Sequence, residues 1–435
     1  MTETLDTSIP SAAGASDRPA HRDSNVLRWL GAYLSSMVGD SVYYTALSWA
    51  AVQTGTPSQA GVVMAVSALP RAVLLLGGGV IADRLGPRRV VIGSDAVRCA
   101  AVLAVAALLF LTTPGLWPLA ALSLVFGAVD AVFIPAVGAL PARVTAKDQL
   151  ARVQGMRGLA IRLANVVGAP LGGLGVAVGG AATAFGLAGL LIAVSVPLLI
   201  SVRVRELPAD DKDGKVGTLH TTDATDVPEA APAQPRRELR DGFAYIRGHR
   251  VLAPLMLAIA LGDFGFVGPL NIGLTLLADR RGWGASGMGW VLAGFGVGAG
   301  IASLLLAVRG RLPRAGLVAA YAILAGSVAI GALAYVPSLL GAVGVSLLVG
   351  LLAGLSGAMC GALLQTQAEP AYLGRVTAVA SLVSLGLAPL SMPFAGAAVA
   401  AWGVAPVFVV SAAVCGLGGV VVLCAPALRR AELPR

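Results

Sequence analysis

The chain has 435 residues, of which 57% are hydrophobic and 12% are charged, and its formal net charge is +9. Soluble domains carry about 25% charged residues, so this composition excludes an ordinary water-soluble domain. The basic excess could indicate nucleic-acid binding, but most lysines and arginines fall in tails and alternate loops, where they indicate membrane topology. We therefore expect a lipid bilayer around most of the chain and no nucleic-acid partner.

Twelve apolar runs follow one another along the chain, and each is long enough to cross a hydrocarbon core of about 30 Å. The predicted spans are residues 27–50, 58–82, 90–112, 116–140, 152–178, 181–202, 251–278, 286–309, 314–336, 339–364, 373–399 and 403–426. Basic residues concentrate in every second loop and in the tails, so both termini are expected in the cytoplasm and the protein in the cell (plasma) membrane.

One long polar, proline-rich segment divides the twelve spans into six and six. At its end, RELRDGFAYIRGHR is similar to an interfacial helix that leads into the seventh span. The predicted organisation is a cytoplasmic tail (1–26), an N-terminal half (27–202), a largely disordered cytoplasmic linker (203–250), a C-terminal half (251–426) and a second cytoplasmic tail (427–435).

The loop between the second and third spans reads GVIADRLGPRR. This loop resembles the G-x-x-x-D-R-x-G-x-R-R signature of the major facilitator superfamily. The resemblance implies an all-α membrane protein whose twelve transmembrane helices form two pseudo-symmetric six-helix halves. It also implies a conformational latch made by Gly79, Asp83, Arg84, Gly86, Arg88 and Arg89. The arginines alone could be positive-inside anchors, but anchoring does not need Asp83.

Looser patterns narrow the resemblance within that family. Pro70-Arg71, Asp95 to Arg98 and Leu239 to Phe243 are similar to the drug:proton antiporter branch that includes macrolide-efflux and enterobactin-export proteins. The fifth span carries a Gly-Ala-Pro-Leu-Gly-Gly run close to the antiporter pattern, with Pro170 displaced by one place. The resemblance implies export by alternating access. Asp95 and Arg98 are expected nearer the cytoplasmic surface, as support for the latch.

Five charged residues are expected about 15–20 Å deep, counted at 1.5 Å per helical residue. An uncompensated charge there is costly, so these side chains should pair or line a cavity. Asp40, Asp130, Arg71 and Arg162 can neutralise one another as a purely structural network. Asp263 has no intramembrane base in its own half, and an unpaired acid in low dielectric tends to carry a proton. Asp263 could equally be a protonated acid bonded to a neighbouring carbonyl.

The proton-coupling candidates are therefore Asp263, Asp40 and Asp130. Tyr43, Tyr44 and Phe264 are candidates for the substrate cavity, although each aromatic could equally be a packing residue. No cofactor and no metal site is expected, and the proton gradient is the expected energy source.

We expect a monomeric secondary active transporter that exports a small hydrophobic or amphiphilic compound such as a drug, antibiotic, siderophore or secondary metabolite. Its expected partners are that compound, protons and lipid. An importer or uniporter with the same fold is the alternative. An enzyme would need a nucleophile–base pair or a metal cluster, which the spans lack, and a sensor would need a further folded domain.

Overall fold

The computed structural model describes residues 22–68, 70–71, 73–74, 81, 84–145, 149–204, 235–309, 314–369 and 372–431. All regular secondary structure in these residues is helical. Nine of the described helical stretches, with the continuous run Leu252–Arg280 counted as one, are long and apolar enough to cross a membrane. In a bilayer an α-helix satisfies its own backbone hydrogen bonds, which explains why an apolar chain of this length takes this form.

The helices form two consecutive sets separated by residues 205–234. The first set is α1 (Ser24–Thr54), α2 (Pro57–Ala65), α4 (Pro87–Leu111), α5 (Trp117–Val144) and α6 (Leu150–Ser201). The second set is α7 (Pro235–Gly248), α8 (Leu252–Gly268), the π-helix η3 (Pro269–Gly273), α9 (Leu274–Arg280), α10 (Gly284–Arg309), α11 (Ala315–Leu333), α12 (Leu339–Gln367), α13 (Leu373–Trp402), α14 (Val404–Cys424) and α15 (Pro426–Arg429).

The count of nine differs from the twelve predicted spans for three local reasons. Within α6 the backbone leaves the helical region at Gly179 and Gly180, where φ of Gly180 is +74°, so α6 contains the predicted spans 152–178 and 181–202. α1 covers the first predicted span, but its polar residues keep it out of the nine. α2 is the beginning of the predicted span 58–82, which continues into residues outside the described ranges.

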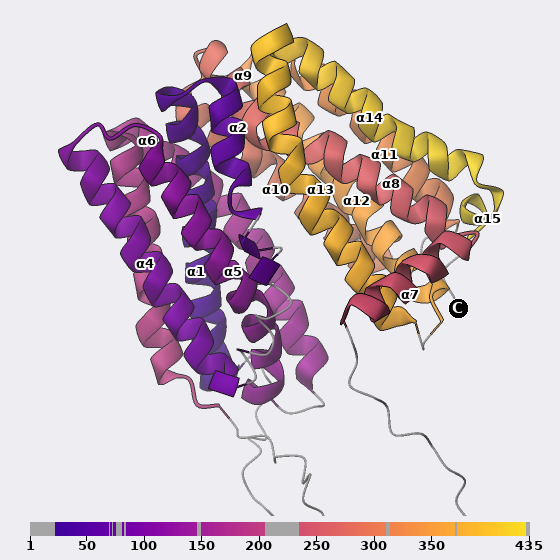
Figure 1. Ribbon diagram of the computed structural model, residues 1–435, viewed down its shortest axis with the longest axis horizontal. Helices are drawn as coiled ribbons and strands as arrows, with labels where there is room; N and C mark the ends of the chain where they lie inside the picture. Colours follow the sequence, from indigo (N-terminus) through magenta and orange to yellow (C-terminus); the bar gives the residue numbers. More distant parts are fainter. Residues whose placement is uncertain are drawn as a thin grey trace, which may run out of the picture.

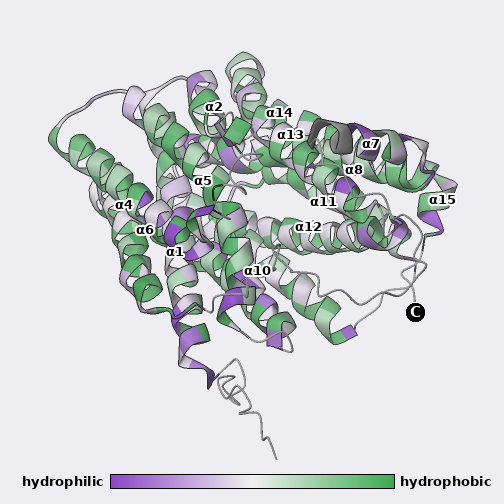
Figure 2. Ribbon diagram, turned by 60° about the horizontal axis from the view of Figure 1, so that its bottom comes forward, coloured by the Kyte–Doolittle hydropathy of each residue, from purple (hydrophilic) through white to green (hydrophobic). Residues whose placement is uncertain are grey.

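The two sets form two halves that lean against each other (Figure 1). We call the end of the bundle near residues 22, 204 and 235 the linker end. The opposite end, near the α1–α2 and α9–α10 connections, is the far end. In Figure 1 the halves meet around α2 and α9 and diverge toward the linker end. Figure 2 shows hydrophobic colours along most of the helix lengths, as expected for surfaces in contact with lipid.

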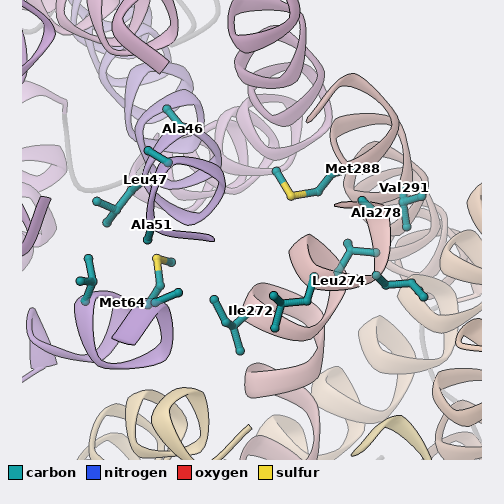
Figure 3. Packing of buried hydrophobic residues seen from close by; sticks show 14 of the residues in the cluster. Ala46, Leu47, Ala51, Met64, Ile272, Leu274, Ala278, Met288 and Val291 are labelled. Atoms are coloured by element: carbon teal, nitrogen blue, oxygen red, sulfur yellow. The ribbon is translucent and has the colours of Figure 1, made fainter. Parts of the chain in front are cut away.

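Buried apolar side chains show the same asymmetry between the two ends. One hydrophobic cluster contains residues of both halves, among them Leu47 and Met64 from the first and Ile272 and Met288 from the second (Figure 3). At the linker end each half has a separate cluster, around Trp29 in the first half and around Leu363 in the second. The described residues thus share a core between the halves only toward the far end.

Small residues bring the halves into close contact. A Cβ atom at Gly289 of α10 would lie 2.6 Å from the Ala169 carbonyl oxygen of α6, and one at Gly61 of α2 would lie 2.6 Å from that of Met392 in α13. Small residues such as glycine are typical where membrane helices approach each other closely. Near the far end, the Gln53 amide also donates to the Asp279 carboxylate across the halves (2.7 Å).

Polar side chains fix the helix ends at the linker end. Asn25 at the start of α1 makes two 2.7 Å hydrogen bonds with the backbone of Arg203, which follows α6. In the other half, α7 packs on the start of α13, where the Tyr245 and Tyr372 rings stack with centroids 4.3 Å apart. α7 lies where the sequence predicted an interfacial helix, and its Arg240 and Phe243 are exposed.

Candidate functional site

Five charged side chains meet inside the first half, and we call them the acid–base cluster. They are Asp40 of α1, Arg71 beyond the end of α2, Asp95 and Arg98 of α4, and Asp130 of α5. Three helices and the segment after α2 therefore contribute to one buried group of charges. A buried charge is tolerated in a bilayer only where partners of opposite sign surround it.

Arg98 is the centre of this cluster and is fully buried. Its guanidinium donates to the carboxylates of Asp40 (2.8 Å) and Asp95 (2.5 Å), and a carboxylate oxygen of Asp130 lies 3.7 Å away. The guanidinium also lies over the ring of Phe133, 3.9 Å from its centroid. Such a stacked arrangement suits the planar arginine and would not suit a lysine.

Arg71 is the second base of the acid–base cluster. Its guanidinium donates to the Asp130 carboxylate (2.5 Å) and to the Tyr44 hydroxyl (3.2 Å). The side chains of Arg71 and Asp130 are 17% and 13% exposed, so this pair is less deeply buried than Arg98. Asp130 thus bridges the two arginines, and Tyr44 extends the hydrogen bonds toward the neighbouring cavity.

The charges of the cluster do not balance. Three carboxylates and two guanidinium groups sum to a formal charge of −1 when all are ionised. Asp95 is fully paired, since it also accepts a hydrogen bond from Ser195. In Asp40, one carboxylate oxygen is buried and contacts no hydrogen-bond donor among the described residues. The unpaired oxygen of Asp40 is therefore a place where a proton could compensate the excess charge.

A cavity of about 380 Å³ lies between the halves, and we call it the central cavity. Asp40 is the only charged residue among the described side chains that line it. Hydroxyl, amide and apolar groups make up the rest of the wall: Met37, Ser41, Tyr44, Thr45, Ser48, Ile161, Asn165 and Ala169 from the first half, and Leu270, Asn271, Thr275, Met288, Leu292 and Phe295 from the second. Such a lining suits a mostly apolar compound with a few polar groups.

Asp263 lies in a different environment in the second half. One of its carboxylate oxygens accepts a hydrogen bond from the Ser384 hydroxyl (2.5 Å). No ion pair to Asp263 occurs within the described ranges. Asp263 also lines a cavity of about 210 Å³ within its own half, which we call the side cavity.

The structure brings together some of the predicted charged residues and not others. Asp40, Arg71 and Asp130 meet as expected, but Arg162 does not join them, because it donates to the carbonyl of Ala299 in α10 (3.2 Å). The base beside Asp40 is Arg98 instead. Asp95 and Arg98, which the sequence analysis assigned to support of the latch, therefore belong to the buried cluster.

The three predicted aromatic residues have different surroundings. Tyr44 lines the central cavity. Tyr43 does not, since it is fully buried and its ring stacks on Phe126 with centroids 3.7 Å apart. Phe264 contacts Phe394 in a groove between α8, α13 and α14, away from the central cavity.

Part of the predicted latch lies outside the described residues, namely Gly79 and Asp83. Gly86 precedes α4 with φ of +82°, a conformation that favours glycine. Arg88 donates to the carbonyls of Leu199 and Ile200 at the end of α6, where it satisfies carbonyl groups left free by the helix. Arg84 and Arg89 are exposed.

Several polar residues of the central cavity escaped the sequence reasoning. Asn165 and Asn271 carry amides, and the hydroxyls of Ser48 and Thr275 meet across the two halves at 2.5 Å. Asn271 lies in the π-helix η3, a type of helix that occurs frequently at functional sites, but no sequence pattern predicted it. Within the described residues, no group of three or more histidine, cysteine or acidic side chains could hold a metal ion.

The family model described as Major Facilitator Superfamily matches residues 29–385. The chain therefore belongs to this superfamily and is a membrane transporter of that fold. Two curated relatives are called enterobactin exporter EntS, from Escherichia coli O127:H6 and from Shigella boydii serotype 18. Each is 24% identical over 365 residues, which cover 81% of this chain and 82% of the relative.

Solved structures agree with the fold. The nucleoside transporter NupG superposes with a TM-score of 0.65 at 14% identity, covering 94% of this chain and 100% of NupG. A transporter of the POT family in complex with 5-aminolevulinic acid gives 0.68 at 12% identity, covering 95% and 98%. A bacterial homolog of the lysosomal transporter Spinster, inward-facing and unoccupied, gives 0.62 at 13%, covering 96% and 97%.

Proposed function

We propose that this transporter exports a small hydrophobic or amphiphilic compound in exchange for protons. The observation that carries the proposal is the central cavity, in which a carboxylate of an acid-rich buried cluster faces a mostly apolar space between two halves. A site at the interface of the halves is where alternating access needs it. The relatives called enterobactin exporters favour export as the direction.

Alternating access accounts for the asymmetry between the two ends. The halves share a hydrophobic cluster toward the far end and have separate clusters at the linker end. With both termini in the cytoplasm, this state presents the central cavity to the inside of the cell. Export then requires that the far end open, which separates Gln53 from Asp279 and Ser48 from Thr275.

Two acids are suited to carry the coupling proton, for different reasons. Asp263 has no described base beside it, so its charge is uncompensated whenever it is ionised. Asp40 belongs to a cluster with one more acid than bases and has a free oxygen next to the central cavity. We favour Asp263, because a proton can leave it without breaking an ion pair, and Asp130 is the least suited because it bridges two arginines.

Transport into inside-out vesicles tests this proposal. A growth-inhibition panel on expressing and non-expressing cells first selects a compound to which expression gives resistance. Vesicles with an acidic lumen should then accumulate that compound, labelled, and should release it when the pH gradient is collapsed. Accumulation only with the gradient reversed would indicate import, and equilibration unaffected by the gradient would indicate a uniporter.

The orientation is tested separately in intact cells. We infer that the protein is a monomer of the plasma membrane with both termini inside. Cysteines at positions 58 and 338 should then react with an impermeant thiol reagent, while a cysteine at position 222 should not. Labelling at position 222 would reverse the orientation, and with it the side to which the central cavity opens.

A further inference from the structure

The side cavity is lined by residues of α8, α11, α12 and α14 of the second half and measures about 210 Å³. Its walls are made almost entirely of apolar and small residues, such as Ile259, Ile323 and Gly326. Asp263 is the only charged residue among the described side chains that line it, and the Ser356 side chain adds one hydroxyl. A carboxylate facing an otherwise apolar space is costly unless a group of opposite charge or a proton accompanies it.

A pair of aromatic rings connects the wall of the side cavity to the wall of the central cavity. Phe266 lines the side cavity, Phe295 lines the central cavity, and their ring centroids are 5.5 Å apart. A void of about 10 Å³ lies beside this pair, with Phe266 and Leu270 in its wall, and Leu270 also lines the central cavity. The side cavity and the central cavity therefore lie on either side of one pair of contacting rings.

The chemistry of the wall defines what the side cavity can bind. Apolar surface excludes a compact hydrated ion and favours a ring or short alkyl group. The Asp263 carboxylate keeps one oxygen on Ser384 and can accept a charge-assisted hydrogen bond from a cationic donor. An anion would lie beside Asp263 with no described base in the wall to offset the repulsion.

The geometry points to the side cavity as a second binding subsite, which holds an apolar group bearing a protonated amine beside the central cavity. This inference rests on the proposed function in one respect: the occupant is taken to be part of a transported compound. A phospholipid is a poorer fit, because its phosphate would have to lie near Asp263.

A glycine in the wall provides a substitution that fills the subsite. A Cβ atom at Gly357 of α12 would meet no heavy atom within 4 Å, so a leucine there can extend into the side cavity without a backbone clash. Gly361, one turn further along α12, also has no heavy atom within 4 Å of its Cβ position but does not line the cavity. Gly361→Leu is therefore the matched control for Gly357→Leu.

Equilibrium dialysis with purified full-length protein measures the effect, with naphthylmethylammonium as the probe. Filling the cavity with Gly357→Leu should weaken binding of the probe by about tenfold or more, and Gly361→Leu should leave it unchanged. Asp263→Asn should weaken binding of naphthylmethylammonium by about tenfold and should leave binding of the neutral naphthylmethanol unaffected. Naphthoate should bind weakly to every variant.

Native cysteines report where the probe binds. Cys360 and Cys415 line the side cavity, whereas Cys424 is exposed and outside it. Bound naphthylmethylammonium should slow modification of Cys360 and Cys415 by methyl methanethiosulfonate, measured by peptide mass spectrometry, and should not change Cys424. If these two thiols prove inert even without the probe, the dialysis comparison decides alone.

Three results would overturn the subsite. If naphthylmethylammonium binds equally well to Gly357→Leu and to the parent, the probe binds elsewhere. If Asp263→Asn weakens binding of naphthylmethanol or naphthoate as much as binding of naphthylmethylammonium, the site does not recognise the amine. Protection of Cys360 by added phospholipid, with no probe present, would identify a lipid as the occupant.

Proton-driven transport is measured on the same preparations. Transport without binding at the side cavity rejects only the subsite, and binding without proton-driven transport rejects only the proposed function.

Discussion

The two halves of this transporter handle buried acids in opposite ways. The first half surrounds Asp40, Asp95 and Asp130 with two arginines, whose hydrogen bonds join α1, α4, α5 and the segment after α2. The second half leaves Asp263 with a serine hydroxyl and an apolar cavity. A charge shared among several helices holds those helices together, whereas an acid with one neutral partner can gain or lose a proton without breaking an ion pair.

The largest effect on stability is expected when the shared base is removed. Arg98→Leu leaves three carboxylates with a single arginine inside the bundle, so it should lower the free energy of unfolding by about 3–5 kcal/mol and sharply reduce expression. Arg162→Leu is the control, because within the described part of the chain Arg162 donates only to the backbone carbonyl of Ala299. Thermal unfolding in detergent measures both. Equal losses of stability in the two variants would show that Arg98 and its cluster contribute no more to stability than Arg162 does.

A smaller effect is expected from single acids of the cluster, and they should not be equivalent. Among the described residues, Asp130 is the one carboxylate that contacts Arg71, so Asp130→Asn should cost about 2 kcal/mol. Asp40→Asn leaves Arg98 paired with Asp95 and brings the cluster to two acids and two bases, so it should cost less. The thermal unfolding midpoints of the two variants measure this difference. A larger loss of stability for Asp40→Asn than for Asp130→Asn would contradict the charge count.

Two adjacent tyrosines provide a finer test beside the same cluster. Tyr44→Phe removes a hydrogen bond to Arg71 and should cost about 1 kcal/mol. The Tyr43 hydroxyl is buried and has no hydrogen-bond partner among the described residues, so Tyr43→Phe should be neutral or slightly stabilising. Unfolding midpoints of the two variants, which differ only in position, decide between these expectations.

The smallest effect on stability is expected in the second half, together with a large effect on coupling. Asp263→Asn imitates the protonated acid and keeps a partner for Ser384, so it should change the free energy of unfolding by less than about 1 kcal/mol. In vesicles the variant should lose accumulation driven by a pH gradient but keep downhill exchange. Accumulation at the parental level would transfer the coupling role to Asp40.

Much of the fold could be predicted from the sequence, because a bilayer leaves an apolar chain few alternatives to helices. The predicted break between spans at residues 178–181 corresponds to the non-helical Gly179 and Gly180 inside α6. The loop signature indicated the superfamily to which the chain belongs. Depth along the helix was also sufficient to place Asp40, Arg71 and Asp130 at one level, where the structure brings them together.

One piece of information was missing from the sequence, namely the direction in which each charged side chain points around its helix axis. Arg98 lies 11 residues beyond Pro87, about 16 Å along α4, so its depth alone could have placed it in the cluster. Arg162 lies at a similar depth but points to α10. Depth therefore shows which charges can meet, while the packing of glycines such as Gly61 and Gly289 decides which helix faces turn toward each other.

The hydrophobic cluster that the halves share toward the far end also has a thermal consequence. Opening that end to water hydrates apolar side chains such as Leu47 and Ile272, which raises the heat capacity. Apolar association weakens on cooling, so lower temperature should shift the resting population toward the state that opens at the far end. In the proposed transport cycle, the balance between the two states is thus set partly by the solvent.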